Sequence, residues 1–202
     1  MAASVALSPD GKLLAAGTAW KSAAPGAKDK LFANQKIESC VLTVWDTNTG
    51  RQVFHRTEKF AGGIWDLAFS PDGSHLAAAM GRYADQGTSS GRIKLWNSSN
   101  WRQEHEFRGH TGSVWSVAFN AAGTRIVSSS GPWMKGSGQA KVWDVETGLE
   151  LLTIADDNDP VFGIAISPDG HRLATANGNG LVRLWNGEPL IEAPDYQELP
   201  LE

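Results

Sequence analysis

The chain has 202 residues, a formal net charge of −4 and 41% hydrophobic residues, which excludes a disordered chain. No apolar run approaches the roughly 20 residues of a membrane-spanning helix, and the N-terminus lacks a secretion signal. A single cysteine, Cys40, excludes an internal disulfide, and the acidic balance argues against a nucleic-acid partner. We therefore expect a cytoplasmic protein with neither a nucleic-acid nor a membrane partner.

A four-residue turn motif recurs along the chain and marks internal repeats. Ser8-Pro9-Asp10-Gly11 reappears at 70–73 and 167–170, and a degenerate copy, Asn-Ala-Ala-Gly, occupies 120–123. Each copy separates two short apolar runs, a third run ending in tryptophan follows, and a weaker fourth run completes the unit. Proline presets φ and glycine accepts a positive φ, so these motifs are turns. The pattern predicts four units of four antiparallel strands.

The tryptophans that end the third runs carry a family resemblance. They are Trp45, Trp96, Trp143 and Trp185, followed by aspartate in the first and third units and by asparagine in the others. A strand, an SPDG turn, a second strand and a strand ending in Trp-Asp resemble the WD40 repeat of β-propellers. The resemblance implies an all-β fold of four four-stranded WD40-type blades. Their expected bounds are about 3–60, 61–109, 110–157 and 158–193, followed by a loose C-terminal tail at 194–202.

The WD40 family also has a polar network inside its blades. It joins a Gly-His histidine, a hydroxyl on the second strand, a turn aspartate and the tryptophan of the third strand. By motif position, the resemblance implies His110, Ser129 and Trp143 for the third unit, without the aspartate. Because the second and fourth units lack the histidine, we expect those blades to depend more on packing.

The spacing of the motifs separates a constant half of each repeat from a variable half. From each third-strand tryptophan to the next turn glycine the spacing is 28, 27 and 27 residues (45 to 73, 96 to 123, 143 to 170). From each turn glycine to the tryptophan of its own unit the spacing falls from 34 through 23 and 20 to 15 residues. The variation therefore lies between the second and third strands. In a meander this loop shares an edge with the connection between units, which in WD40-like propellers is the common partner-binding face.

Two sets of residues on this face are candidates for binding a partner. Insertions at about 17–39, 80–91 and 130–139 contribute aromatic, methionine and basic residues, and three of the four first strands open on a large aromatic residue. The sequence leaves open whether they bind a partner or pack within the loops and between blades. The candidates are Trp20, Lys21, Arg82, Tyr83, Trp133 and Met134 in the insertions, and Trp65, Trp115 and Phe162 at the strand openings.

Four WD40-type blades cover about half a ring and expose a sheet face at each end. Three arrangements satisfy this pattern. Two copies join into an eight-bladed homodimeric ring, the chain is part of a longer array, or four blades close alone with unusual geometry.

The sequence favours a binding scaffold over an enzyme. The segment 87–91 fits the G-x-S-x-G nucleophile motif but lies in a loop of an all-β chain, and the five histidines lack the spacing of a zinc site. We expect no catalytic residue, metal or cofactor, and a function as a protein-interaction scaffold whose basic loop residues steer a partner. The alternative is a self-assembling half-propeller whose main role is oligomerisation; a ligand or enzymatic site in the central channel is favoured less.

Overall fold

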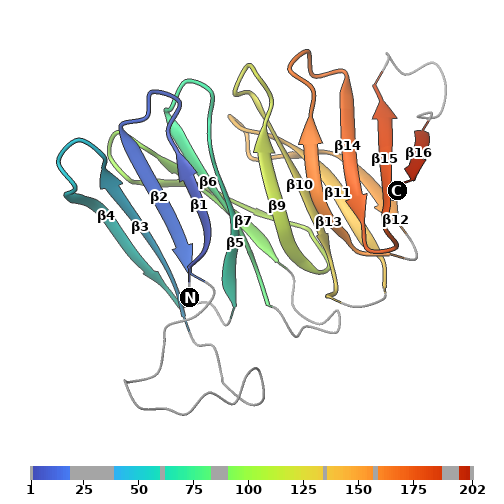
Figure 1. The fold of residues 1–202 in the computed structure, drawn as a ribbon, viewed down its shortest axis with the longest axis horizontal. Helices are drawn as coiled ribbons and strands as arrows, with labels where there is room; N and C mark the ends of the chain where they lie inside the picture. Colours follow the sequence, from blue (N-terminus) through green and yellow to red (C-terminus); the bar gives the residue numbers. More distant parts are fainter. Residues whose placement is uncertain are drawn as a thin grey trace, which may run out of the picture.

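The computed structural model describes residues 2–18, 39–59, 62–82, 91–133, 136–156, 159–187 and 196–200. Within these residues every regular element is a β-strand, and each strand is antiparallel to its neighbours (Figure 1). The strands form four sheets of four, each in simple chain order. The predicted all-β class and the four-stranded units are confirmed.

The four sheets follow one another along the chain. Sheet 1 contains β1 (Ala2–Leu7), β2 (Leu13–Thr18), β3 (Cys40–Asp46) and β4 (Gln52–Glu58). Sheet 2 contains β5 (Gly63–Phe69), β6 (His75–Gly81), β7 (Arg92–Asn97) and β8 (Gln103–Arg108). Sheet 3 contains β9 (Ser113–Phe119), β10 (Arg125–Gly131), β11 (Gly138–Asp144) and β12 (Glu150–Asp156). Sheet 4 contains β13 (Val161–Ile166), β14 (Arg172–Asn177), β15 (Leu181–Asn186) and β16 (Tyr196–Pro200).

Sheet 4 differs from its predicted bounds at its last strand. The sequence predicts that this blade ends by residue 193 and that 194–202 form a loose tail. Instead β16 pairs with β15, in a register that runs from Trp185↔Tyr196 to Leu181↔Pro200. The tail prediction was wrong for 196–200. The free edge of β15 carries unpaired backbone groups, and a fourth strand satisfies them.

The turns between first and second strands repeat with the same hydrogen bonds. In the first turn Ser8 Oγ donates to Asp10 Oδ1 (2.7 Å) and accepts from the Leu13 amide (2.9 Å), while the amide of Gly11 donates to the Ser8 carbonyl (2.8 Å). Gly11 has a φ of 71°, which glycine adopts without a steric penalty. Equivalent bonds recur at Ser70 and Ser167, so the SPDG motif fixes the same turn in three sheets.

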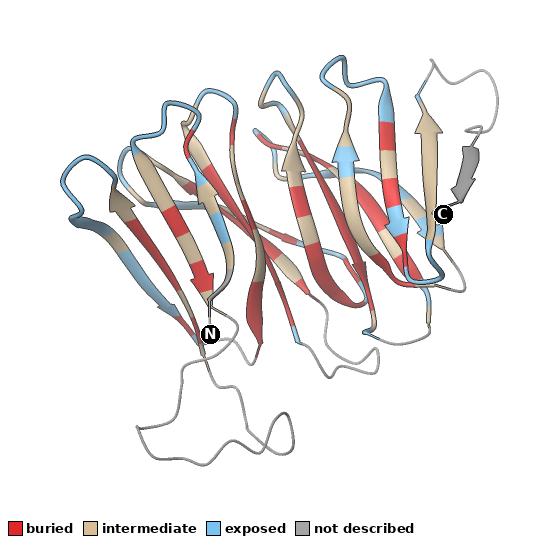
Figure 2. Cartoon of the chain, in the orientation of Figure 1, coloured by how far each residue is buried: buried red, intermediate tan, exposed pale blue. Residues whose placement is uncertain are grey.

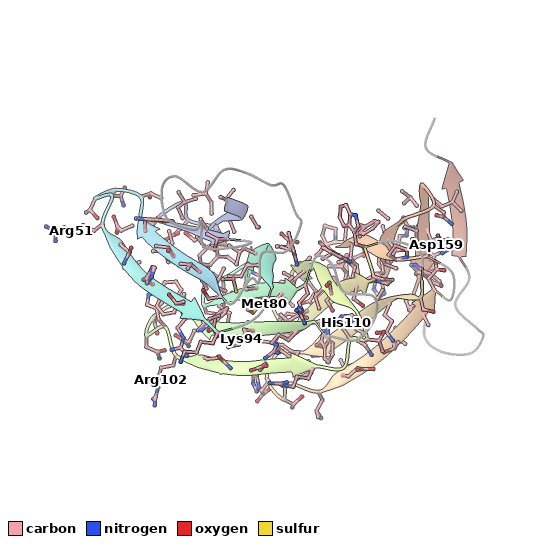
Figure 3. The ribbon with its side chains drawn as sticks, turned by 90° about the horizontal axis from the view of Figure 1, so that it is seen from below. Arg51, Met80, Lys94, Arg102, His110 and Asp159 are labelled. Atoms are coloured by element: carbon pink, nitrogen blue, oxygen red, sulfur yellow. The ribbon has the colours of Figure 1, made fainter. Side chains whose placement is uncertain are left out.

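The sheets stack face to face along an open arc. The first strands β1, β5, β9 and β13 of successive sheets contact one another. Figure 3, seen from below the view of Figure 1, shows the sheets as an arc with Arg51 and Arg102, which precede fourth strands, at its outer rim. Sheets 1 and 4 stand at opposite ends of the row in Figure 1, so within the described residues each has one face that no other sheet covers.

Three hydrophobic clusters fill the three junctions between sheets, and each receives the third-strand tryptophan of the later sheet. Trp96 packs in a cluster with Leu42 and Val44 of sheet 1. Trp143 packs in the next cluster with Ile93 of sheet 2, and Trp185 lies against the third. Figure 2 shows the buried residues recurring along the strands that form these junctions. Each tryptophan therefore faces the preceding sheet.

Ion pairs join fourth strands to the following sheet at two junctions. Glu58, at the end of β4, lies 2.7 Å from Lys94 Nζ on β7, and both side chains are buried. Asp156, at the end of β12, pairs with Arg183 on β15. Lys94 and Arg183 each stand two residues before the third-strand tryptophan, so the two pairs occupy equivalent places in the repeat.

One carboxylate joins three sheets at their innermost strands. Asp66 on β5 accepts hydrogen bonds through Oδ2 from the amide of Val117 (3.0 Å) and the hydroxyl of Ser116 (2.9 Å), both on β9. Its Oδ1 accepts from the Leu67 amide (2.9 Å) and from Ser4 on β1 (3.5 Å). Asp66 therefore sets the position of sheet 2 relative to both of its neighbours.

The turn between β7 and β8 contains a strained tryptophan. Trp101 has a φ of 58°, where the corresponding turns of sheets 1 and 3 place Gly50 and Gly148 at 67° and 72°. A side chain in this left-handed region costs about 1–2 kcal/mol. The Trp101 ring stacks on Phe54 of sheet 1, with centroids 4.8 Å apart and planes 14° from parallel. Aromatic stacking contributes about 0.5–1.5 kcal/mol beyond burial, so this contact across the junction offsets the strain.

Substitution of Trp101 separates the strain from the stacking. Trp101→Ala loses the stacked ring and keeps a strained Cβ, whereas Trp101→Gly loses the ring and relieves the strain. We expect both variants to unfold more easily than wild type, and the glycine variant to be more stable than the alanine variant by about 1 kcal/mol. Chemical denaturation measures both. An alanine variant as stable as the glycine variant would contradict the strain.

Removal of one partner of the buried pair is expected to cost more than removal of both. Lys94→Met leaves the Glu58 carboxylate buried beside the exposed Arg56 (3.3 Å), and we expect a loss of about 3 kcal/mol in unfolding free energy. The double variant Lys94→Met with Glu58→Gln should recover at least about half of that loss. Lys12→Met, which removes an exposed pair with Asp10, is the matched control and should leave stability nearly unchanged. Equal losses of unfolding free energy for Lys94→Met and Lys12→Met would refute a buried ion pair between Glu58 and Lys94.

Candidate functional site

The third-strand tryptophan of sheet 3 belongs to a buried polar network. Trp143 Nε1 donates to Ser128 Oγ (2.8 Å), which is also hydrogen-bonded to His110 Nε2 (2.6 Å). The other ring nitrogen of His110, Nδ1, is hydrogen-bonded to Ser130 Oγ (2.6 Å). The histidine ring meets the Trp143 ring edge-on at 5.7 Å. His110 and Trp143 are therefore in the network that the family resemblance implies.

The prediction that Ser129 supplies the hydroxyl of this network was wrong by one residue, because Ser128 supplies it. Side chains alternate between the faces of a strand, so Ser128 and Ser130 lie on the face of β10 that carries Trp143, and Ser129 lies on the other. Ser129 Oγ is buried and makes no hydrogen bond to the described residues. Three consecutive serines hide the register in the sequence, whereas the pairing of Ile126 with Trp143 reveals it.

The other three tryptophans lack the histidine and differ from one another. Trp185 Nε1 donates to Thr175 Oγ1 (3.1 Å), which occupies the place of Ser128. Trp96 is buried opposite alanine in that place and is held by packing, as predicted for the second unit. Trp45 is half-buried and lies on the open face of sheet 1. The fourth unit therefore keeps more of the network than the sequence predicts.

Burial fixes the charge of His110. Desolvation of the ring, with a contribution from the nearby Lys141 ammonium, lowers the pKa of His110 to about 3. The imidazole is therefore neutral at pH 7, with one nitrogen that donates and one that accepts. Both serine contacts are compatible with this neutral ring, so His110 holds the network as a buried structural residue.

An aromatic cluster lies at the edge where the first strands begin. Trp65, Trp115 and Phe162 open the first strands of sheets 2, 3 and 4, and Trp133 follows β10. The Trp115 ring centroid is 5.3 Å from that of Trp65, 5.7 Å from Phe162 and 5.6 Å from Trp133, and Trp133 lies 5.6 Å from Phe162. The four rings form one continuous group that crosses two junctions, called here the aromatic cluster.

Hydrogen bonds hold two of these rings in place. Trp65 Nε1 donates to the Gly81 carbonyl at the end of β6, and Trp115 Nε1 donates to the Gly131 carbonyl at the end of β10, both at 2.9 Å. Gly131 also approaches Pro160 so closely that a Cβ would lie 2.7 Å from Pro160 Cα. The end of β10 and the start of β13 therefore meet at this edge.

Of the two alternatives that the sequence leaves open for these aromatics, packing between neighbouring sheets accounts for Trp115, which is buried. Trp133 differs, because 47% of its surface is exposed although its ring touches Trp115 and Phe162. The cluster therefore combines a buried base with an exposed ring. The sequence names all four residues but not their contact, since Trp133 comes from a loop insertion and the others from strands.

The remaining candidates lie at or beyond the limits of the described chain. Trp20, Lys21, Tyr83 and Met134 lie outside the described residues. Arg82 follows β6, and its carbonyl oxygen accepts a hydrogen bond from Ser113 Oγ (2.5 Å) at the start of β9. This contact places Arg82 at the same edge of the sheets as the aromatic cluster.

Chemistry other than binding has little support in the described residues. Burial raises the pKa of the Cys40 thiol to about 12, so this cysteine is unreactive. No group of three His, Cys, Asp or Glu residues in the described ranges is placed to hold a metal ion. An open depression of about 490 Å³ lies at the opposite edge, between the first turns of sheets 1 and 2, but its carboxylates, Asp10 and Asp72, accept the hydrogen bonds of their own turns. The described segments also contain no helix able to cross a membrane.

The fold and the tryptophan repeats define a β-propeller assembly, and comparison with known proteins identifies the family. The family model described as WD domain, G-beta repeat, matches residues 52–97, 101–144 and 149–186. The chain therefore belongs to the WD40 repeat family, whose members are generally protein-interaction scaffolds without catalytic activity. Each of the three matched segments begins at or just before the fourth strand of one sheet and ends with the third strand of the next.

Similar proteins share the repeat but are much longer. Coronin-7 of Bos taurus is 30% identical over 142 residues, which cover 65% of this chain and 14% of that protein. Apoptotic protease-activating factor 1 of Rattus norvegicus is 30% identical over 74% of this chain and 11% of its own length. Cell division cycle 20.5, cofactor of APC complex, of Arabidopsis thaliana is 30% identical over 74% of this chain and 33% of its own length. The chain thus spans a third or less of these curated relatives.

A solved structure shares the fold. Hydrazine synthase of Kuenenia stuttgartiensis superimposes with a TM-score of 0.73 over the whole of this chain and 55% of its own chain, at 14% sequence identity. At that identity the likeness concerns the arrangement of strands alone. It supports a propeller-like stacking of the four sheets.

The His110 network predicts how stability changes with pH. Its pKa of about 3 in the folded chain lies below the ordinary 6.5, so the unfolded chain binds one more proton between these values. The stability that neutral His110 contributes is complete above pH 6.5 and is lost as the pH falls. We expect the difference in unfolding free energy between wild type and His110→Gln to narrow by about 1.4 kcal/mol for each pH unit below 6.5.

Ser130→Ala is the matched control for this measurement, because it removes a partner of His110 but keeps the titrating ring. Its difference from wild type should change little with pH. Denaturant unfolding at pH 7, 6 and 5 measures all three proteins. A His110→Gln difference that stays constant over this range would show that the folded histidine titrates normally.

Proposed function

We propose that the chain is a non-catalytic protein-interaction scaffold that binds its partner at the edge carrying the aromatic cluster. The observation that carries this proposal is Trp133, an exposed ring supported by the rings of Trp115 and Phe162. Tryptophan is among the residues most enriched at the energetic centres of protein interfaces. The WD40 family membership supports the broader class of function.

The support beneath Trp133 favours binding on energetic grounds. A surface side chain normally loses rotamer freedom when a partner covers it, at a cost of about 0.5–1.5 kcal/mol. Trp133 already contacts two rings, one of which is itself fixed by a hydrogen bond to Gly131. A partner that covers Trp133 therefore gains apolar burial with less ordering cost. In this proposal Trp65, Trp115 and Phe162 hold the site, and Trp133 contacts the partner.

The proposal extends to the chemistry of the partner. Arg82 lies at this edge, and the insertions add Lys21 and further lysines, so we propose a partner segment that is acidic and carries an apolar side chain for Trp133. Trp20, Tyr83 and Met134 are proposed to enlarge the contact. The net charge of −4 supports a protein partner over a nucleic acid, and the buried, unpaired Cys40 supports a reducing, cytoplasmic location.

Capture of binding partners tests the site. The wild-type chain and Trp133→Ala are each immobilised, and the proteins that they capture are identified by mass spectrometry. The affinity of each variant is then measured with the purified partner. We expect Trp133→Ala to weaken binding at least about 10-fold, the scale of a central interface residue. A triple variant that also replaces Trp20 and Tyr83 by alanine should weaken binding further.

Leu149→Ala provides the matched control, since Leu149 is an exposed apolar residue in the turn between β11 and β12, at the opposite edge of the sheets. It should bind as wild type does. Circular dichroism and thermal unfolding must show that each variant folds. Unchanged affinity of folded Trp133→Ala, or equal loss with Leu149→Ala, would refute the proposed site.

A further inference from the structure

The open face of sheet 1 has the composition of a buried junction. Val5 and Leu7 on β1 are 66% and 60% exposed. The place of Val5 is taken by Leu67 on β5 and by Val117 on β9. These two side chains are only 5% and 4% exposed, because each faces a preceding sheet. Trp45, the third-strand tryptophan, lies on the same open face. Sheet 1 therefore presents the surface that sheets 2 and 3 bury.

The open face of sheet 4 is the other half of such a junction. In sheets 1 to 3 the face turned toward the next sheet carries small residues on the second strand, and Ala15, Ala77 and Val127 are completely buried there. Ala174 holds the same place in sheet 4 and is only half-buried, while Ala165 and Ala176 on this face are exposed. The two end faces of the arc therefore carry different side chains, and these are the two sides that meet at an internal junction.

One contact inside the chain shows how such faces fit. At the junction of sheets 1 and 2, Gly17 lies under Ile64 and Leu67, and a Cβ at Gly17 would stand 2.4 Å from Ile64 Cγ2 and 3.5 Å from Leu67 Cδ1, so Ile64 is what requires glycine there. The residue of sheet 4 at the place of Gly17 is Ala176, and by strand register the residues of sheet 1 at the places of Ile64 and Leu67 are Ala2 and Val5. Both are smaller than their equivalents in sheet 2, and the replacement of Ile64 by alanine suits the extra methyl group of Ala176.

We infer that the open faces bind a second copy of this chain, with sheet 4 of each copy docked on sheet 1 of the other. Two such junctions close a two-fold ring of eight blades, a number within the range of about four to eight found in propellers. Unlike the binding site proposed above, this surface lies at the ends of the arc and is independent of the aromatic cluster.

The area of the faces favours the closed pair over an open chain of copies. Four strands spaced about 4.8 Å apart and about five to six residues long at about 3.3 Å per residue give roughly 350 Å² of flat area per face. A single junction buries about 700 Å², less than a stable interface needs, whereas the two junctions of a closed pair bury about 1,400 Å², within the usual range of about 1,200–2,000 Å².

The open face of sheet 1 lacks a cation that two internal junctions carry, whereas the open face of sheet 4 carries the exposed Arg172 at the start of β14. The cation that forms the ion pair at two internal junctions, Lys94 or Arg183, is replaced in sheet 1 by Thr43. Thr43 is hydrogen-bonded to His55 of its own sheet (3.2 Å). No lysine or arginine at this place has to be desolvated when sheet 4 of a second copy covers it, so the burial of Val5 and Leu7 is not opposed by a buried charge there.

Light scattering coupled to size exclusion, over a range of concentrations, tests the ring. We expect the wild-type chain to have twice its 21.7 kDa mass. Val5→Glu and Ala176→Lys, each placing a charge in both junctions, should raise the dimer dissociation constant at least about 100-fold. The combination of both changes in one chain places the opposite charges together and should restore most of the dimer. Leu149→Glu, at an exposed site away from both end faces, is the matched control and should remain dimeric.

We expect each variant to fold, because Val5 and Ala176 are exposed in the single chain. Circular dichroism checks this. Monomeric single variants with a dimeric combined variant would establish the head-to-tail junction. A wild-type chain that is monomeric or polydisperse at every concentration would overturn the inference and assign the open faces to other blades. A dimer that persists in both single variants would overturn it as well, because another surface would then hold the copies together.

Discussion

The burial of sheet faces by neighbouring sheets is the constraint on which this structure depends. A four-stranded sheet of short strands has two faces, and in sheets 2 and 3 both carry apolar residues, such as Ile93 on one face of sheet 2 and Leu67 on the other. Neither face is stable in water alone. Stacking solves this for each internal sheet, and the third-strand tryptophans Trp96 and Trp143 are the largest fully buried side chains among the described residues. The same constraint leaves the two end sheets each with one unsatisfied face.

The three junctions have similar apolar packing but different polar contacts. Ion pairs join sheets 1 and 2 and sheets 3 and 4, whereas the junction of sheets 2 and 3 contains the neutral His110 with its two serines. Asp66 adds a bond from sheet 2 to each of its neighbours. The ion pairs and the bonds of Asp66 cross a junction, whereas the partners of His110 all belong to sheet 3, so a neighbour that lacks a partner for Lys94, Arg183 or Asp66 leaves buried groups unpaired. These contacts specify the order of the sheets as well as their attachment.

The sequence predicts the repeating part of the fold because turn chemistry and strand alternation act locally. The SPDG turns and the third-strand tryptophans were recognisable for that reason. Ser129 was misassigned because three adjacent serines conceal the strand register. The last strand was missed because β16 pairs after a connection longer than the repeat predicts, and the stacking of Trp101 on Phe54 joins residues 47 positions apart. The aromatic cluster was named residue by residue, but its contacts depend on the angle between sheets, which no local pattern encodes.

The offset between the sequence repeat and the sheet has an evolutionary consequence. The matched segment 52–97 begins with β4, the last strand of sheet 1, and continues through the first three strands of sheet 2. It therefore holds both partners of the ion pair that crosses this junction, Glu58 and Lys94, whereas Leu42 and Val44 of the apolar cluster lie outside it. A gene duplication of such a segment copies this ion pair along with the strands. A repeat added in this way already carries a polar contact between its own fourth strand and the sheet that follows.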